Sequence, residues 1–271
     1  MHMNKAMTIS DQLGRKLHFE TRPTRIVSLV PSITELLIDM GLESEVVGRT
    51  LFCIHPERIK QSIPQIGGTK TLKIEKIKEL APTIIIANKE ENTMVQIEEL
   101  ASLFPVYISD IKTIDEAFAF ISDMGVLFNL SHPCNEIKQG IQNLLNHLQS
   151  ISKSGLKVAY LIWKEPLMAV AGDTYIHALL KHLNWENVFE NSKERYPQTS
   201  VEELNHLGAD LVLLSSEPFP FRAKHQDQFI QEGLRAKTVL VDGELFSWYG
   251  SRLLHVAEHF TRCIHQINAL T

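Results

Sequence analysis

The sequence is poor in cysteine and has no excess of basic charge, and each shortage narrows the class of protein. Its three cysteines, Cys53, Cys134 and Cys263, lie far apart and form no CxxC pair, which argues against a disulfide framework or a zinc ribbon. The 27 lysines and arginines stand against 32 aspartates and glutamates, which gives a net charge of −5. A nucleic-acid-binding surface, which usually needs a basic face, is therefore not expected.

Long hydrophobic runs are also missing. No apolar run approaches the roughly 18–20 residues that a membrane-spanning helix needs. The opening stretch "MHMNKAMTISDQLGRKLHF" has no apolar core of the signal-peptide kind. On the sequence as it stands we expect no signal peptide, so a cytoplasmic location stays open.

What the sequence does contain is a regular alternation of short apolar runs and amphipathic stretches. "RIVSLV" (25–30) predicts a buried strand, and the segment from Pro31 to Gly41 predicts a helix capped by Ser32 or Thr34. "EVVGRT" then predicts a second strand, and further helices and strands follow in turn. Strands that alternate with helices are typical of a parallel sheet with helices on both faces, so we predict the α/β class.

One helix–turn–strand unit occurs twice. "IEKIKELAPTIIIA" (74–87) returns as "VEELNHLGADLVLL" (201–214), shifted by 127 residues (201 − 74 = 127). The second residue of each copy is a glutamate, Glu75 or Glu202. The repeat predicts two lobes built to one plan.

The segment between the two copies predicts one long helix. In residues 133–155 the apolar residues recur at spacings of three and four, on one helix face over about four turns. They are Ile137, Ile141, Leu144, Leu148 and Ile151. Because the strand–helix pattern restarts afterwards, we interpret the helix as a linker rather than as an ordinary packing helix. We predict an N-terminal lobe over 1–131, a linker helix over 132–154 and a C-terminal lobe over 155–271.

Several of these segments resemble a known family. "RIVSLVPSITELL", "IGGTKTLKIEKIKELAPTIIIA" and "YPQTSVEELNHLGADLVLL" are similar to segments of the substrate-binding proteins of iron-chelate and cobalamin ABC importers, in the helical-backbone metal receptor superfamily. "DQLGRKLHFETRPTRIV" resembles the hairpin at the start of iron-chelate members. The resemblance implies two Rossmann-like lobes with parallel central sheets, one long rigid α-helix joining them, and a ligand cleft between the lobes.

The resemblance also implies a role for the repeated glutamates. In the family each lobe presents an acidic residue that docks onto arginines of the membrane permease, and the matching positions are Glu75 and Glu202. A carboxylate that pairs with arginine fixes orientation as well as affinity. The alternative is that glutamate in a first turn serves only the helix dipole.

Aromatic residues concentrate in the loops expected at the carboxyl ends of the strands, where ligands of parallel α/β lobes bind. Large flat rings suit a corrin, a porphyrin or a catecholate chelate, although aromatic residues also fill cores. Tyr196 additionally matches a ligand-side position of the cobalamin-binding members. The predicted ligand contacts are Phe52, Trp163, Tyr196, Trp248, Tyr249 and Arg252. Arg252 is preferred over Arg49 and Arg195 as a partner for an anionic chelate.

One loop departs from the family pattern. Where several cobalamin-binding members have an aromatic residue after the strand "IIIA", this chain has Asn88, Lys89, Glu90 and Glu91. So charged a loop is unusual for the wall of an apolar corrin site. Both a corrinoid and a ferric siderophore therefore remain possible ligands.

Two pairs of residues have spacings that suit a metal. Cys53 and His55 are two apart, and on a strand end their side chains would share one face. A small buried cysteine and a turn histidine explain the same pair without a metal. His255 and His259, four apart, would share one helix face, but the HExxH order is absent and we favour an exposed helix face.

These observations together favour a binding protein and not an enzyme. We predict that it captures a metal chelate, a corrinoid or a ferric siderophore, for an ABC permease, as a monomer with no intrinsic cofactor and no nucleic-acid partner. In the family this role is periplasmic or membrane-tethered. One alternative is binding of bare metal or haem through Cys53 and His55. The other is a cytoplasmic cofactor-handling protein or enzyme on the same scaffold, for which Glu165 or Asp173 could act as a base.

Overall fold

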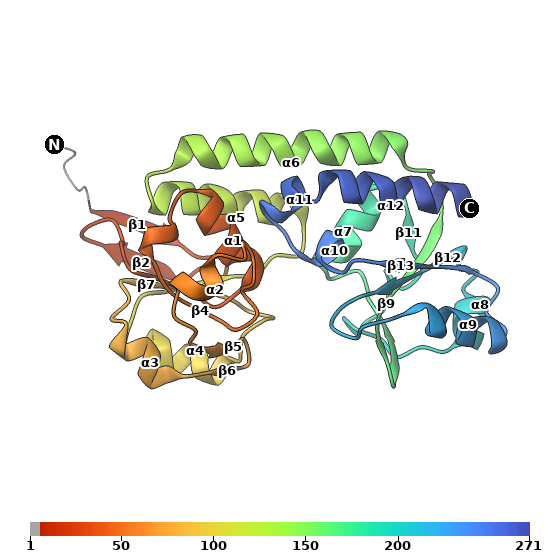
Figure 1. The fold of residues 1–271 in the computed structure, drawn as a ribbon, viewed down its shortest axis with the longest axis horizontal. Helices are drawn as coiled ribbons and strands as arrows, with labels where there is room; N and C mark the ends of the chain where they lie inside the picture. The colour runs from red at the N-terminus through yellow and green to blue at the C-terminus, as the bar shows by residue number, and fades with distance from the viewer. Residues whose placement is uncertain (1–5) are drawn as a thin grey trace. The chain divides into compact units, whose positions relative to one another are not determined.

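The computed structural model describes residues 6–271, and this part of the chain divides into two compact units (Figure 1). The first unit runs up to Ile111 and includes Asp115–Gln139, and the second consists of Lys112–Ile114 and Gly140–Thr271. Each unit is built around its own β-sheet. The α/β class predicted from the alternating pattern is therefore confirmed.

The first unit contains a four-stranded parallel sheet in the order β4-β3-β7-β8. Its strands are β3 (Ile26–Ser28), β4 (Val46–Arg49), β7 (Ile84–Asn88) and β8 (Val106–Ser109). Its helices are α1 (Pro31–Asp39), η1 (Glu43–Glu45), α2 (Ile59–Ser62), α3 (Ile74–Glu79), α4 (Met94–Ala101) and α5 (Ile114–Leu127). Two hairpins, β1 (Met7–Ser10) with β2 (Lys16–Phe19) and β5 (Gly67–Gly68) with β6 (Thr71–Leu72), complete it.

Apolar side chains on both faces of this sheet hold the unit together. Alternate strand residues such as Val27, Ile85 and Ile108 pack with Ile77 of α3 and Ile97 of α4 in one buried cluster. On the opposite face lie α1 and α5 (Figure 1). All five residues of β7 are buried, as expected for a central parallel strand covered on both sides.

The second unit contains a sheet in the order β10-β9-β12-β13, with β11 also paired to β9. Strands β9 (Lys157–Lys164), β11 (Glu186–Asn187), β12 (Leu211–Ser215) and β13 (Lys237–Val241) are parallel, and β10 (Leu167–Ala169) folds back antiparallel on β9. Its helices are α7 (Tyr175–His182), α8 (Val201–His206), α9 (Ala223–Gln231), α10 (Glu244–Ser247), α11 (Arg252–His255) and α12 (Ala257–Leu270). Leu204 of α8 and Phe229 of α9 pack in one buried cluster with Val212 and Leu214 of the sheet.

The internal repeat is visible in the structure. Helix α3 and strand β7 correspond to helix α8 and strand β12, and all four bounds are shifted by 127 residues (215 − 88 = 127). The turns agree as well, because Ala81 (φ 43) and Gly208 (φ 69) occupy the same position and both adopt left-handed backbone. Glycine adopts that conformation without strain, whereas alanine tolerates it at a cost.

The predicted long helix is α6 (Ser131–Ile151), which continues from the first unit into the second. Its buried side chains are Cys134, Ile137, Ile141, Leu145 and Leu148. Leu145 was not in the predicted stripe, and Leu144, which was, is only half-buried. The boundaries 1–131, 132–154 and 155–271 stay a prediction.

The predicted cap of α1 is wrong. The helix begins at Pro31 with Val30 in the capping position, which offers no side-chain hydrogen bond. Proline suits this first position because its missing N–H would have no partner there. None of the helices in the part of the chain that the structure describes is long and apolar enough to cross a membrane.

Candidate functional site

In the first unit, the loop after β4 presents apolar side chains to solvent. Phe52 is 51% exposed, and its neighbours Leu51 and Ile54 are 42% and 37% exposed. Exposed apolar residues this close in sequence are typical of a contact surface. Phe52 was a predicted ligand contact, whereas Leu51 and Ile54 were missed, although the apolar run "LFCI" before Pro56 was a usable signal.

Arg49, at the end of β4, is only 5% exposed. Its guanidinium donates to the carbonyl oxygens of Ile59 (3.1 Å), Thr50 (3.1 Å), Cys53 (3.3 Å) and Lys60 (2.9 Å). These bonds tie residues 50–60 together. Arg49 therefore stabilises the conformation of the loop that follows β4.

Cys53 lies in a buried pocket of hydroxyl groups. Its Sγ is 3.0 Å from Thr34 Oγ1 and 3.1 Å from Thr50 Oγ1, and burial raises the pKa of the thiol. The segment around Cys53 and His55 is a turn and not a strand end, so the expected alternation of side chains does not apply. Among residues 6–271, neither residue belongs to a group of three potential metal ligands. Metal binding here stays a prediction that the geometry does not favour.

Two buried asparagines shape the loop that follows β7. Asn92 Oδ1 accepts from the Asn88 backbone N–H (2.9 Å), and Asn92 Nδ2 donates to the carbonyl oxygens of Leu29 (3.3 Å) and Thr69 (3.0 Å). Glu90 and Glu91 of this loop are exposed. Lys89 of the same loop is also exposed and pairs with Asp110 (2.6 Å), so the loop presents charges of both signs.

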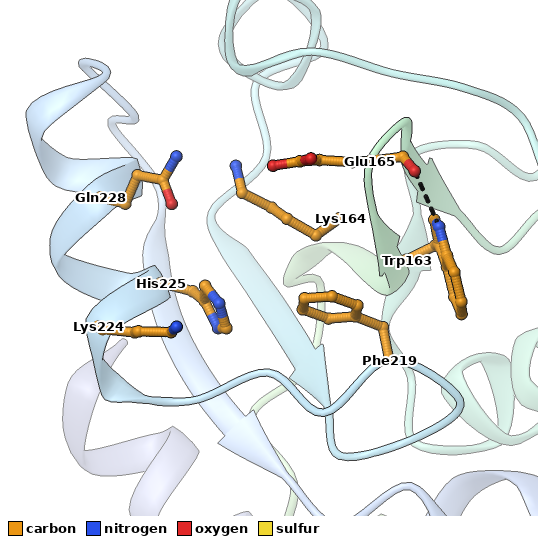
Figure 2. A pocket seen from close by; sticks show the side chains of 7 residues that line it. All are labelled: Trp163, Lys164, Glu165, Phe219, Lys224, His225 and Gln228. Carbon is orange, nitrogen blue, oxygen red and sulfur yellow. Dashed lines mark hydrogen bonds between the residues drawn. The ribbon is translucent and has the colours of Figure 1, made fainter.

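In the second unit, the end of β9 borders a hollow of about 490 Å³. It is lined by Trp163, Lys164, Glu165, Phe219, Lys224, His225 and Gln228 (Figure 2). Trp163 is 40% exposed and donates from Nε1 to the Glu165 carbonyl oxygen (3.0 Å). Phe219 lies between Trp163 and His225, with ring centroids 5.8 Å and 5.4 Å away.

Lys164 and His225 are two of the polar residues that line this hollow. Lys164 Nζ lies 4.6 Å from the centre of the Phe229 ring and 3.7 Å from Glu232 Oε1. His225 Nδ1 accepts from the Arg222 backbone N–H (2.8 Å). Burial, aided by the charge of Lys224, lowers the pKa of His225, so the ring is neutral near pH 7.

Trp248 and Arg252 lie together in the segment that follows β13. The Arg252 guanidinium lies 5.4 Å from the centre of the Trp248 ring system and 3.6 Å from Glu244 Oε2. Trp248 is half-buried, and Arg252 is 7% exposed. Tyr249, the next predicted contact, is 8% exposed and packs edge-on against Tyr175.

Tyr196 is half-buried in the loop before α8. The Arg195 guanidinium lies 5.9 Å from the centre of its ring, and Arg195 pairs with Asp173 (3.4 Å). Asp173 also pairs with Lys112 (2.9 Å). Arg195 and Arg252 are thus both paired with carboxylates of their own unit.

The two repeated glutamates lie at equivalent places but have different neighbours. Glu75 on α3 forms an ion pair with Lys78 (2.7 Å), and its side chain is 81% exposed. Glu202 on α8 is exposed and borders a hollow of about 650 Å³ together with Glu203, Glu232 and Arg235. Within residues 6–271 Glu202 forms no ion pair.

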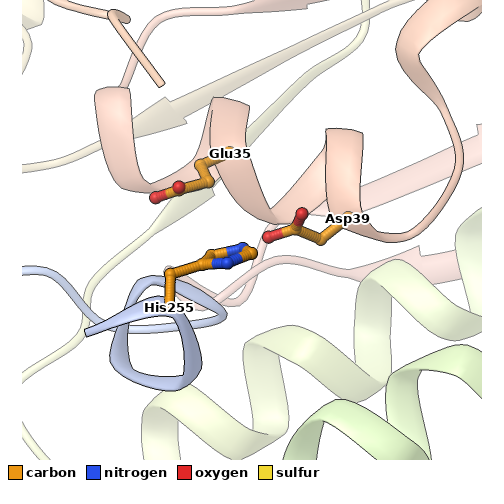
Figure 3. A group of neighbouring side chains, drawn as sticks. All are labelled: Glu35, Asp39 and His255. Atoms are coloured by element: carbon orange, nitrogen blue, oxygen red, sulfur yellow. The ribbon is translucent and has the colours of Figure 1, made fainter. Parts of the chain in front are cut away.

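The prediction that His255 and His259 share one helix face is wrong. His255 ends α11, and His259 lies in α12, with Val256 between the two helices. Elsewhere, Glu35 and Asp39 lie one turn apart on α1 (Figure 3). Glu35 is 3% exposed and Asp39 is exposed, so the two carboxylates differ in environment.

Each of the two α/β units is built on a largely parallel sheet, and one helix links them. Both units carry exposed aromatic residues in the loops at their strand ends. This combination is typical of solute-binding proteins. The chain belongs to the periplasmic binding protein family, whose model matches residues 26–239. The members of this family are binding proteins, so the chain is a binding protein and not an enzyme.

Individual relatives agree with this assignment. A vitamin B12-binding protein of Pectobacterium carotovorum is 24% identical over 243 residues, which cover 87% of this chain and 86% of that protein. A siderophore-binding protein, bound to a complex between two molecules of acinetobactin and ferric iron, matches with a TM-score of 0.78 at 14% identity and covers 96% of this chain and 99% of its own. A periplasmic haem-binding protein from Pseudomonas aeruginosa has a TM-score of 0.75 at 19% identity, over 89% of this chain and 92% of its own. These two structures share the fold with this chain.

Proposed function

We propose that this protein captures a metal chelate and delivers it to an ABC permease. The chelate would be a corrinoid, a haem or a ferric siderophore. The observation that carries the proposal is the duplicated unit, which gives both halves of a periplasmic binding protein an exposed glutamate at the same helix position. Relatives described as binding vitamin B12, haem and a ferric siderophore support the ligand class.

The exposed aromatic side chains are the proposed ligand contacts. Phe52 in the first unit, and Trp163, Tyr196 and Trp248 in the second, keep surface available for stacking on a flat chelate. Tyr249 and Arg252 are nearly buried, so we propose that they support Trp248 and reach the ligand only at their edges. Because Arg195 and Arg252 pair with carboxylates, a strongly anionic ligand would have to compete for them.

Docking is assigned to Glu75 and Glu202, each of which would pair with an arginine of a permease subunit. Charge-assisted carboxylate–arginine pairs are strong and directional, which suits a contact that must form in one orientation. Delivery to a permease requires the protein to work outside the cytoplasmic membrane, as its family name implies. We propose that it does so as a monomer.

A thermal-shift panel tests the ligand class. Purified protein would be heated with cyanocobalamin, cobinamide, haemin, several ferric siderophores and bare divalent metals. A ligand at about a thousandfold its dissociation constant adds about 4 kcal/mol to the free energy of unfolding. One class of chelate should therefore raise the melting temperature by several degrees, and the Trp248→Phe variant should respond less than a Trp185→Phe control, since Trp185 is buried.

The other outcomes would contradict the proposal. A rise in melting temperature with bare metal alone, abolished by Cys53→Ser, would indicate a metal site at Cys53 and His55 instead. No shift with any chelate would contradict capture of a metal chelate altogether.

A further inference from the structure

The indole N–H of Trp248 is held by a carboxylate from a different loop. Trp248 Nε1 lies 3.2 Å from Glu217 Oε1, and the same oxygen accepts from Ser247 Oγ (2.9 Å). Glu217 follows β12, whereas Ser247 and Trp248 follow β13. The carboxylate thus joins the ends of two neighbouring parallel strands.

The backbone around Glu217 fixes where this carboxylate lies. Ser215 Oγ donates to the Glu217 carbonyl oxygen (2.6 Å), and the Gly243 N–H donates to Ser216 Oγ (2.9 Å). A Cβ atom at Gly243 would lie 2.4 Å from Glu217 Cγ, so only glycine leaves room for the side chain. Glu217 is half-buried, and this burial raises the pKa of its carboxyl group.

A second group holds the indole from another direction. The Arg252 guanidinium lies 5.4 Å from the centre of the ring system and is itself paired with Glu244 (3.6 Å). Stacked guanidinium groups attract the faces of aromatic rings. With its N–H bonded to Glu217 and the guanidinium over its ring, the indole has one defined orientation.

We propose that Glu217 is the positioning residue of Trp248, and that it makes Trp248 meet the ligand through its ring and not through its N–H. This inference rests on the proposed function, in which Trp248 contacts the chelate. It narrows the ligand at this position to one with a flat π or apolar face. A ligand that needs a hydrogen-bond donor from Trp248 would have to displace Glu217.

The test uses the three tryptophans as reporters. A ¹⁵N–¹H spectrum of the protein contains three indole signals, from Trp163, Trp185 and Trp248, and Trp248→Phe identifies the last. Hydrogen exchange of the Trp248 indole should be at least tenfold faster in Glu217→Ala than in the unaltered protein. Glu217→Gln should fall between them because its amide oxygen still accepts. Glu165→Gln is the matched control, since Trp163 bonds to the backbone carbonyl of Glu165 and not to its side chain.

A ligand measurement on the same variants completes the test, with cyanocobalamin and haemin as probes. Glu217→Ala should bind the preferred probe at least fivefold more weakly, and Glu217→Gln should recover part of the loss. Unchanged indole exchange in both Glu217 variants would overturn the positioning role. Faster exchange with unchanged affinity would overturn the link to the ligand. If neither probe binds the unaltered protein, the proposed ligand class fails for these two chelates, and indole exchange still decides whether Glu217 positions Trp248.

Discussion

Arg49 shows how a buried cation can organise a loop. Its guanidinium satisfies four backbone carbonyl oxygens between residues 50 and 60, the segment that also presents Phe52. Lysine carries the same charge but has neither the planar fork nor the five donors of arginine. The loop that presents Phe52 is thus held by a nearly buried side chain.

The Arg49→Lys variant should lower the free energy of unfolding by about 2–3 kcal/mol, since hydrogen bonds to charged groups contribute about 1.5–3 kcal/mol each and lysine keeps some of them. Urea denaturation measures the loss. Arg58→Lys is the control, because Arg58 is exposed and its pair with Glu43 should contribute less than about 1 kcal/mol. Equal effects of the two variants would contradict the role of Arg49.

The three thiols predict how stability depends on pH. Burial raises the pKa of Cys134 to about 11 and that of Cys263 to about 12, and it raises the pKa of Cys53 as well. Above the ordinary thiol value near 9, the unfolded chain loses these protons while the folded chain keeps them. The free energy of unfolding should therefore be unaffected by the thiols below pH 9 and should fall between pH 9 and 12.

Urea midpoints measured between pH 8 and pH 10.5 check this expectation. The midpoint should decrease as the pH rises, and the Cys263→Ala variant should show a shallower decrease than the unaltered protein. Native thiols should also react slowly with Ellman's reagent at pH 8. A midpoint independent of pH, or rapid reaction of all three thiols in the folded protein, would contradict their burial.

Among the helices, the duplicated pair α3 and α8 differs in charge. Lys76 and Lys78 accompany Glu75, whereas the positions 127 residues later hold Glu203 and Asn205. Asn205 instead bonds to the carbonyl oxygen of Gly233 and the N–H of Arg235, which holds the end of α9 beside α8. Helix α3 thus partly neutralises its own glutamate, and helix α8 does not.

We expect the two docking contacts to be unequal. Glu202→Gln should weaken binding to the permease by at least about tenfold, because a charge-assisted bond contributes about 1.5–3 kcal/mol and about 1.4 kcal/mol corresponds to tenfold. Glu75→Gln should weaken it less, since Glu75 gives up an ion pair with Lys78 on docking, a pair that contributes about 0.3–0.5 kcal/mol. Binding to the permease–ATPase complex in nanodiscs measures both, and identical losses in the two variants would contradict the difference.

Helix α6 provides a test of packing with its own control. Leu145 is fully buried, so Leu145→Ala should lower the free energy of unfolding by about 2–5 kcal/mol. Leu144 is half-buried, and Leu144→Ala should cost less than half as much. Thermal or urea unfolding compares them, and a larger effect at Leu144 would contradict the observed orientation of the helix.

These elements show how much of the structure can be predicted from the sequence. The strand–helix alternation and the repeat were predictable because buried parallel strands and amphipathic helices have distinct periods. The choice between Leu144 and Leu145 was not, since both fit a 3.6-residue period. Nor was the burial of Arg49 and Arg252, because it depends on how carbonyl and carboxylate groups of the folded loops converge on each guanidinium. The bond between Glu217 and Trp248 joins two loops and left no local signal.

Across both units, charge and aromatic surface are distributed in a way that suits a carrier. The cations expected to meet a ligand are neutralised within their own unit, while Phe52 and Trp163 remain exposed. The protein is thus suited to hold a flat chelate by contact area, while the exposed carboxylates of Glu75 and Glu202 remain accessible to a partner. Neither task requires chemistry on the ligand.

Isothermal titration with cyanocobalamin, haemin and a ferric tris-catecholate tests this account most directly. We predict that one of the three saturates the protein at one ligand per chain with a dissociation constant of about 1 μM or tighter, which corresponds to a binding free energy of about −8 kcal/mol. The heat capacity change should be negative, as burial of apolar surface requires. Absence of binding by all three would contradict the assignment of this chain as a carrier of metal chelates.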